Sequence, residues 1–258
     1  MSATANPSPF DLTGKVALVT GSTMGLGEAT ARVLAAQGAH VIVSSRKAEA
    51  CAEVASAMSA RGLKADGKAC HIGRMEDIAE MYRWIDERFG RIDILVNNAV
   101  LSPWRSIEDT DVGIFTKAVE VDLRGYWYMS VEAAKRMKAQ GGGSIVNIAS
   151  VAALHPDRML GLYSTLKTAL IGMSRSFALE FGKDQVRVNT VLPGLFQTQL
   201  ADAYDEEAKK RITDKAALGR LGRVEEIGYA VAYLSSAAGA YVTGASLVVD
   251  GGLSIASM

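Results

Sequence analysis

The glycine-rich stretch at residues 21–27 constrains the fold of this chain more than any other feature. It follows a short apolar run at residues 15–20 and precedes a helical pattern that ends near Gly38. A second β-branched run at residues 40–44 comes next. A strand, a glycine turn and a helix N-terminus form a unit that binds the pyrophosphate of a dinucleotide, because the backbone can approach the anion and helix N–H groups face it. A glycine cluster by itself indicates only a tight turn, and the surrounding order of elements favours the dinucleotide.

The alternation of strand and helix patterns continues along the chain. Further strands are expected at residues 65–72, 92–96, 144–149, 186–192 and 246–249, and helices at 76–89, 112–138, from 163 onward and at 224–235. Such alternation predicts an α/β fold, a Rossmann-type doubly wound parallel sheet with helices on both faces. We expect one domain over residues 15–258, preceded by a loose N-terminal arm at residues 1–14.

Three residues between positions 150 and 167 form a candidate catalytic group. Tyr163 and Lys167 are four residues apart in a predicted helix and therefore project from one face, and Ser150 follows a predicted strand. Lowering the pKa of a phenol from about 10 to about 7 takes roughly 4 kcal/mol. An ammonium group ~4 Å away supplies that only at an effective dielectric near 20, so Lys167 can activate Tyr163 only in a partly desolvated site. Taken alone, the Tyr163–Lys167 pair favours a surface tyrosine and a solvated lysine, and the rest of the chain favours the catalytic interpretation.

The end of the second strand bears on the choice of cofactor. An acidic residue about 20 positions after the glycines is typical of NAD binding, but here Ser45 and Arg46 occupy that region. A hydroxyl and a guanidinium suit the 2′-phosphate of NADP, since arginine binds phosphate bidentately. The sequence therefore favours NADP(H), with NAD(H) as the alternative if Arg46 only begins a solvated helix.

Composition excludes several other classes of partner. The chain has 28 basic and 28 acidic residues, so neither a nucleic acid nor a membrane surface recognised by bulk charge is expected. Cys51 and Cys70 fit no metal-binding or disulfide pattern, and no metal site is predicted. No apolar run reaches the ~20 residues of a membrane helix, and the N-terminus does not resemble a secretory signal. We therefore expect a cytoplasmic protein with reduced thiols.

Together these features resemble the short-chain dehydrogenase/reductase family in its compact, single-domain form. The resemblance extends from about residue 15 to 252, and it rests on the glycine turn, Asn97-Asn98-Ala99, Ser150, Tyr163 with Lys167, Pro193-Gly194 with Thr198, and Asp250-Gly251-Gly252. It implies that Tyr163 is the catalytic acid/base, that Ser150 orients the substrate oxygen, and that Lys167 lowers the tyrosine pKa and binds the nicotinamide ribose. The residues expected at the cofactor are Gly21, Ser22, Gly25, Leu26, Gly27, Ser45, Arg46, His71, Ile72, Asn98, Ala99, Tyr163, Lys167, Pro193, Gly194, Leu195 and Thr198.

The chain departs from the family pattern at three positions. Asp122 stands where the family usually has a fourth catalytic residue, an asparagine that helps to hold a water in a proton relay; we assign Asp122 to the catalytic group, although its charge would perturb the pKa of Lys167. Val100 replaces a usual glycine. His71 stands where an aspartate commonly contacts adenine, and its alternative role is structural.

The expected substrate pocket is largely apolar, and its predicted walls are Leu101, Trp104, Ser150, His155, Tyr163 and Phe196. Trp104 and Phe196 are equally consistent with core or lid packing, and the charged segment at residues 199–215 with a lid or a solvated helix. We predict an NADP(H)-dependent reductase or dehydrogenase acting on an apolar or aromatic ketone or secondary alcohol. A 3-oxoacyl-thioester reductase and a non-catalytic dinucleotide-binding protein are the alternatives. The resemblance also implies a homotetramer, formed through residues 112–138 and 163–181.

Overall fold

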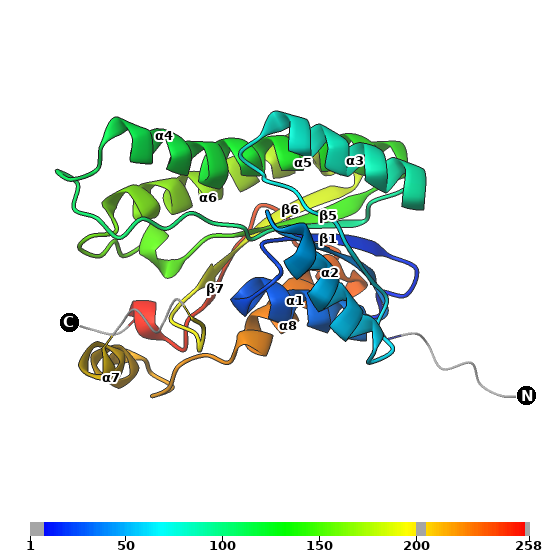
Figure 1. The fold of residues 1–258 in the computed structure, drawn as a ribbon. Coiled ribbons are helices and arrows are strands. Elements are labelled where there is room, and N and C mark those ends of the chain that lie inside the picture. The colour runs from blue at the N-terminus through cyan, green and yellow to red at the C-terminus, as the bar shows by residue number, and fades with distance from the viewer. Residues whose placement is uncertain (1–7, 200–204, 256–258) are drawn as a thin grey trace, which may run out of the picture.

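A seven-stranded parallel sheet forms the centre of the computed structural model, which describes residues 8–199 and 205–255 (Figure 1). The strand order is β3-β2-β1-β4-β5-β6-β7, and every neighbouring pair is parallel. The strands are β1 (Val16–Thr20), β2 (His40–Ser44), β3 (Ala65–Gly67), β4 (Ile94–Asn97), β5 (Gly143–Ile148), β6 (Val186–Pro193) and β7 (Ser246–Val249). The chain moves outward from β1 to β3 and then returns to β4 beside β1, so the strand order reverses at this point, where ligands bind in such sheets.

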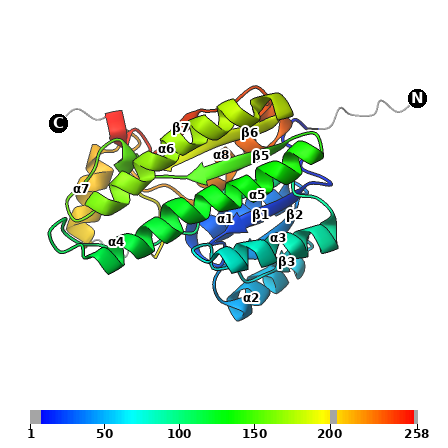
Figure 2. The same cartoon turned by 90° about the horizontal axis from the view of Figure 1, so that it is seen from above.

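Helices cover both faces of the sheet (Figures 1 and 2). They are α1 (Gly25–Ala36), α2 (Ala48–Ser59), α3 (Met75–Phe89), α4 (Val112–Val119), α5 (Tyr126–Ala139), α6 (Gly161–Phe181), α7 (Glu206–Lys215) and α8 (Val224–Ser235). The first face carries α3, α4, α5 and α6, and the opposite face carries α1, α2 and α8. One apolar core cluster lies on each side of the sheet. Burial on both faces explains why the central strands read as continuous apolar runs. The predicted doubly wound α/β fold is confirmed.

Two predicted elements differ from the structure. The strand expected at residues 65–72 ends at Gly67, because β2 is its one neighbour and ends at Ser44. The long helix expected at residues 112–138 is divided into α4, the π-helical segment η1 (Glu120–Gly125) and α5. Within η1 the Asp122 side chain accepts a hydrogen bond from the backbone of a neighbouring loop, and Gly125 packs where a Cβ would lie 2.6 Å from the Ile72 carbonyl oxygen. Such π-turns are frequent at functional sites.

The described part of the N-terminal segment, residues 8–14, packs against the domain. Leu12 is buried in a core cluster, and the Ala238 N–H donates a hydrogen bond of 2.9 Å to the Pro9 carbonyl. A loose arm is therefore wrong for these residues. The segment predicted as a lid contains α7, which has no buried residue; positions 200–204 of that prediction lie outside the described residues.

Candidate active site

The turn between β1 and α1 is too closely packed to accept side chains. Gly21 and Gly25 have φ values of 63° and 56°, which L side chains rarely adopt. A Cβ on Gly21 would lie 2.7 Å from the Ala99 Cα, and one on Gly27 would lie 2.2 Å from the Gly21 carbonyl oxygen. Close backbone approach is what a pyrophosphate-binding turn requires. Thr198, in the loop after β6, lies 3.6 Å from the position of a Cβ on Gly25, so this loop covers the turn.

Asn98 fixes this turn to the end of β4. Its Nδ2 donates to the carbonyl oxygens of Thr20 (2.9 Å) and Gly21 (3.1 Å). The Thr20 hydroxyl in turn accepts from the backbone N–H groups of Asn98 and Ala99. Ser22 is fully buried and accepts a hydrogen bond from the Ser44 N–H, which joins the ends of β1 and β2. These hydrogen bonds of Asn98 and Ser22 thus fix the backbone of the turn at which the cofactor is predicted to bind.

At the end of β2, Ser45 and Arg46 differ in how firmly they are held. The Ser45 hydroxyl lies 3.3 Å from the Cys51 sulfur, whose Sγ also accepts the Ser45 N–H. Arg46 is exposed, and its guanidinium makes no hydrogen bond or ion pair with another described residue. No existing ion pair must therefore break before Arg46 contacts a phosphate.

His71 is tied into its own turn. Its Nδ1 accepts the Gly73 N–H at 3.1 Å, and its backbone N–H donates to Asp77 Oδ2 at 2.9 Å. The structure thus gives His71 a structural role, which was the alternative to adenine contact. Ile72 beside it is buried.

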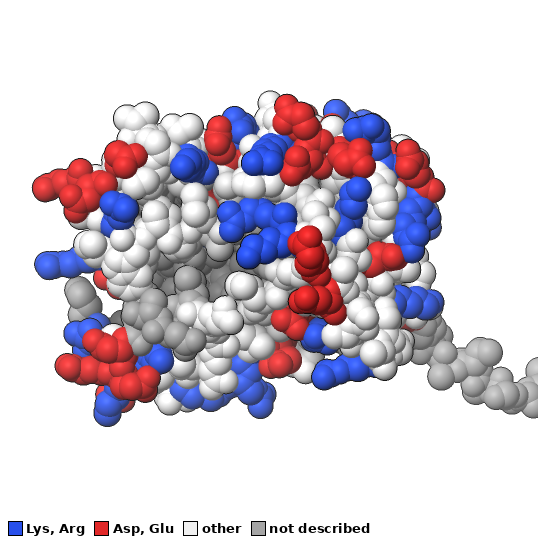
Figure 3. All heavy atoms as spheres, in the orientation of Figure 1, with Lys and Arg blue, Asp and Glu red and all other residues white. Residues whose placement is uncertain are grey.

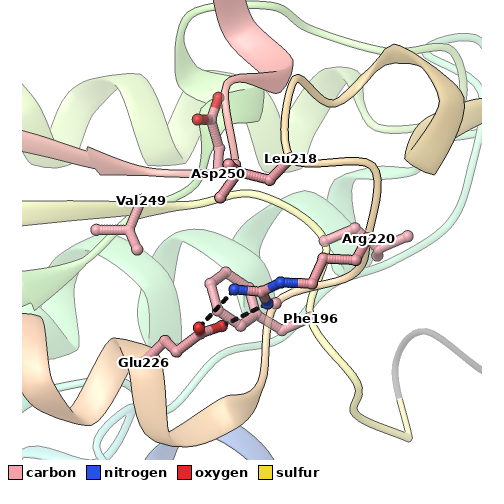
Figure 4. Close-up of a pocket in the computed structure, with 9 residues that line it drawn as sticks. Phe196, Leu218, Arg220, Glu226, Val249 and Asp250 are labelled. Atoms are coloured by element: carbon pink, nitrogen blue, oxygen red, sulfur yellow. Dashed lines mark hydrogen bonds and ion pairs between the residues drawn. The ribbon is translucent and has the colours of Figure 1, made fainter.

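The loop after β6 turns Phe196 away from solvent and into the core. Gly194 packs against Asp250, where a Cβ would lie 2.8 Å from the Asp250 Cα. Phe196 is 5% exposed and lines a pocket of about 160 Å³ beside the Arg220–Glu226 ion pair, shown in Figure 4. Of the two roles open for Phe196, this position favours packing over substrate contact. Pro193 is buried and Leu195 half-buried at the same strand end.

Lys167 lies in the desolvated environment that tyrosine activation requires. Its side chain is buried, and Nζ donates a hydrogen bond of 2.8 Å to the Ile148 carbonyl at the end of β5. The same Nζ is 5.6 Å from the centre of the Tyr163 ring. Burial lowers the pKa of Lys167 to about 8, and the negative charge of Asp122 opposes this shift. Tyr163 is half-buried on α6, on the same face as Lys167.

Asp122 is completely buried in η1. Its Oδ1 accepts the Leu101 N–H at 2.8 Å, which fixes the start of the loop that carries Leu101 and Trp104. Burial raises the pKa of Asp122 to about 6, while Lys167 and the Leu101 hydrogen bond act in the opposite direction. The structure thus brings the predicted aspartate and lysine into one electrostatically coupled group.

Ser150 begins a short 3-10 turn, and its Oγ accepts the Ala152 N–H at 3.1 Å. A hydroxyl that accepts one hydrogen bond still has its own O–H to donate. Leu101 is half-buried, while Trp104 and His155 are exposed. Figure 3 shows that the molecule is hollowed on this side, below α4, with lysine and arginine side chains next to the hollow.

Tyr126 is a member of this group that the sequence patterns did not single out. It is completely buried, and its ring centre lies 5.3 Å from Lys167 Nζ. Burial, followed by the charges of Asp122 and Tyr163, raises its pKa well above the ordinary value. The one signal for it in the sequence is its position four residues after Asp122 in a predicted helix.

Comparisons with known proteins fit this architecture. The chain matches the family model described as enoyl-(acyl carrier protein) reductase over residues 21–254. It is 38% identical over 244 residues to dehydrogenase/reductase SDR family member 4 of Oryctolagus cuniculus, covering 93% of this chain and 94% of that protein. It is 35% identical over 249 residues to L-rhamnose 1-dehydrogenase (NAD(P)(+)) of Azotobacter vinelandii, covering 94% and 97% of the two chains. The crystal structure of a gluconate 5-dehydrogenase from Burkholderia cenocepacia in complex with NADP and tartrate superimposes with a TM-score of 0.93 at 30% identity, covering 96% of this chain and 98% of that one.

The fold and these relatives define the chain as an NAD(P)-dependent oxidoreductase that acts on alcohol or carbonyl groups. It belongs to the short-chain dehydrogenase/reductase family. Across residues 8–199 and 205–255, no helix is long and apolar enough to cross a membrane.

Proposed function

We propose that this protein transfers a hydride between NADP(H) and a ketone or secondary alcohol, with Tyr163, Ser150 and Lys167 as its catalytic residues. The observation that carries the proposal is the burial of Lys167 between the Ile148 carbonyl and the Tyr163 ring. A desolvated ammonium at this position strongly favours loss of the phenolic proton. A solvated surface lysine would have little effect on the tyrosine.

In carbonyl reduction, Tyr163 donates its proton to the substrate oxygen while the Ser150 hydroxyl donates a hydrogen bond to the same oxygen. In alcohol oxidation the proton returns to Tyr163. Bound NADP(H) supplies or accepts the hydride. The glycine turn fits its pyrophosphate, because the positions of Gly21 and Gly27 leave no room for a Cβ and keep the backbone accessible to an anion.

We place the 2′-phosphate of NADP against Ser45 and Arg46. Arg46 is exposed and has no competing partner among the described residues, and the related gluconate 5-dehydrogenase was crystallised with NADP. The remaining cofactor contacts follow the predicted set, with Asn98 and Ser22 acting through the turn. His71 is the exception, because its hydrogen bonds with Gly73 and Asp77 support the structural role.

For the substrate we propose an apolar or aromatic ketone or alcohol, bound between Leu101, Trp104 and His155 near Tyr163. A 3-oxoacyl thioester is the second candidate: the matching family model is described as enoyl-(acyl carrier protein) reductase, which names an acyl thioester, and Ser150, Tyr163 and Lys167 could also act on a 3-oxo group. A panel of ketones, acyl thioesters, polyols and secondary alcohols, assayed with NADPH, NADH and their oxidised forms, separates these classes.

Replacing Tyr163 with phenylalanine tests the catalytic assignment. The variant keeps the ring over Lys167 but loses the transferable proton, so turnover should fall by about 10²-fold or more. Cofactor binding, followed by NADPH fluorescence, should change little. Tyr229→Phe is the matched control, because Tyr229 is exposed on α8, on the opposite face of the sheet from α6. Turnover of Tyr163→Phe equal to that of the native protein refutes the assignment.

We further propose a homo-oligomer, with a tetramer as implied by the family resemblance. Large apolar side chains remain exposed on the outer face of the α4–α6 layer, including Val112, Phe115, Trp127, Tyr128 and Leu179. Such patches mark protein contacts. Sedimentation should therefore show a species larger than 27.4 kDa. We also propose a cytoplasmic location, since both cysteines are free thiols.

A further inference from the structure

The buried hydroxyl of Tyr126 has no part in the chemistry described so far. Tyr126 Oη and Asp122 Oδ2 are both buried, and neither has a hydrogen-bond partner among the described residues. Buried polar atoms nearly always have such a partner. The two residues are four positions apart across the end of η1, so their side chains project to the same side of the helix.

Lys167 supplies a third polar group at this place. An ammonium group has three N–H donors, and one of them is bonded to the Ile148 carbonyl. The Lys167 Nζ lies 5.3 Å from the Tyr126 ring centre. It also acts electrostatically on Asp122, although no direct ion pair joins the two among the described residues. Two buried oxygens without a partner and a buried ammonium with further N–H donors thus belong to neighbouring residues, and buried polar groups of this kind are commonly joined by an internal water.

We propose that Tyr126 is a positioning residue of the active site, whose hydroxyl holds one internal water together with Asp122 Oδ2 and Lys167 Nζ. This water and hydroxyl stabilise the carboxylate and the ammonium in their charged forms, and the charged ammonium in turn acts on Tyr163. The kinetic consequence rests on the proposed function. The effect on folding does not, because the charges of Asp122 and Lys167 influence stability whether or not a substrate is turned over.

The titratable groups that face Tyr126 are few. Asp122 lies on η1, and Tyr163 and Lys167 lie on α6. Among the described residues, no other titratable group contributes to the electrostatic surroundings of Asp122, Tyr126 or Lys167. Any pH-dependent effect of removing the Tyr126 hydroxyl must therefore arise from the titration of Asp122, Tyr163 or Lys167.

The first experiment measures thermal stability between pH 4 and pH 7 at one protein concentration, for the native chain, Tyr126→Phe and Tyr82→Phe. Tyr82 is the matched control, because it is also buried in this helical layer but donates its hydroxyl to the Met129 carbonyl at 2.6 Å. Losing a hydrogen bond to a charged group should raise the pKa of Asp122 by about one unit. The Tm of Tyr126→Phe should therefore fall further below the native Tm as pH rises, while the Tyr82→Phe difference stays constant. A Tyr126→Phe difference that does not change with pH overturns the proposal.

The second experiment measures the pH dependence of kcat and KM for alcohol oxidation. In Tyr126→Phe the alkaline limb of the kcat profile should move about one unit toward lower pH, because Lys167 loses support for its charge. Tyr82→Phe should leave the limb in place. A uniform loss of kcat at every pH indicates a merely structural hydroxyl and also overturns the proposal. If no alcohol is oxidised by the native chain, the proposed function fails, and the stability experiment still decides the role of Tyr126.

Discussion

Replacing Asp122 with asparagine gives a prediction whose sign and size both follow from the structure. Asparagine keeps the Oδ1 that accepts the Leu101 N–H at 2.8 Å, and it removes the buried charge. Burial raises the pKa of Asp122 from 3.8 to about 6, so the folded state binds more protons than the unfolded state between these values. Native stability therefore falls as pH rises through this window. The asparagine variant lacks this dependence.

The size of the effect follows from the two pKa values. Integrating the linkage between pH 4 and pH 6 gives a change of about 2 kcal/mol in the stability difference, in favour of the variant. For a chain of this length that corresponds to roughly 4 to 8 °C in Tm. Lys167, with a pKa near 8, is protonated throughout the window in the folded state, so it adds little to the slope.

The assay is thermal unfolding of both proteins from pH 4 to pH 6, at matched protein concentration because an oligomer has a concentration-dependent Tm. The pH 4 value is the internal reference, since Asp122 is almost fully protonated there in the folded state. The Tm difference between the two proteins at pH 4 therefore measures the effects of the substitution other than the loss of charge in the folded state. A Tm difference that is equal at pH 4 and pH 6 would show that Asp122 titrates normally and would refute its described burial beside Lys167. The expected shift is opposite in sign to that of Tyr126→Phe, so the two variants check one another.

Two further predictions concern the cofactor. Arg46→Ala should weaken NADPH binding by about 10- to 100-fold, as expected for loss of a charge-assisted hydrogen bond, and leave NADH binding nearly unchanged; equal losses in a fluorescence titration would refute the 2′-phosphate contact. Gly27→Ala should reduce binding of both cofactors, because its Cβ would lie 2.2 Å from the Gly21 carbonyl oxygen and force the turn to move. Gly172→Ala, in α6 with no atom within 4 Å of the added Cβ, is the matched control and should bind normally while gaining up to about 1 kcal/mol of stability.

The fold was predictable because its determinants are local or periodic. The apolar runs that became β2 and β7 were placed at their observed residues, as was helix α8. Parallel strands buried on both faces leave an uninterrupted apolar signal, and a glycine turn between strand and helix leaves a spacing signal. The strand boundary at residues 65–72 was less predictable, because it depends on where the neighbouring strand ends.

In the candidate site, too, some features were predictable from residue spacing, whereas others depend on tertiary packing. The spacing of Tyr163 and Lys167 predicted that both lie on one face of a helix, as they do on α6. The catalytic hypothesis also required a desolvated lysine, which the sequence could not show. That desolvation comes from packing: Lys167 is enclosed by β5, η1 and α5, and it is bonded to Ile148. The helical period over residues 112–138 predicted one helix, and it contained no sign of the π-turn that carries Asp122.

The sequence by itself predicted the doubly wound sheet, a glycine turn of the phosphate-binding type and a set of candidate reactive groups, because each prediction depends on residue type at a fixed spacing. Only the tertiary structure decided how far the pKa values of Asp122 and Lys167 depart from their ordinary values, and which residues lie beside them. The pKa values of Asp122 and Lys167 depend on burial and on each other's field, and both arise when segments distant in the chain pack together. The same holds for Tyr126, whose position beside Lys167 arises only where α5 packs against α6.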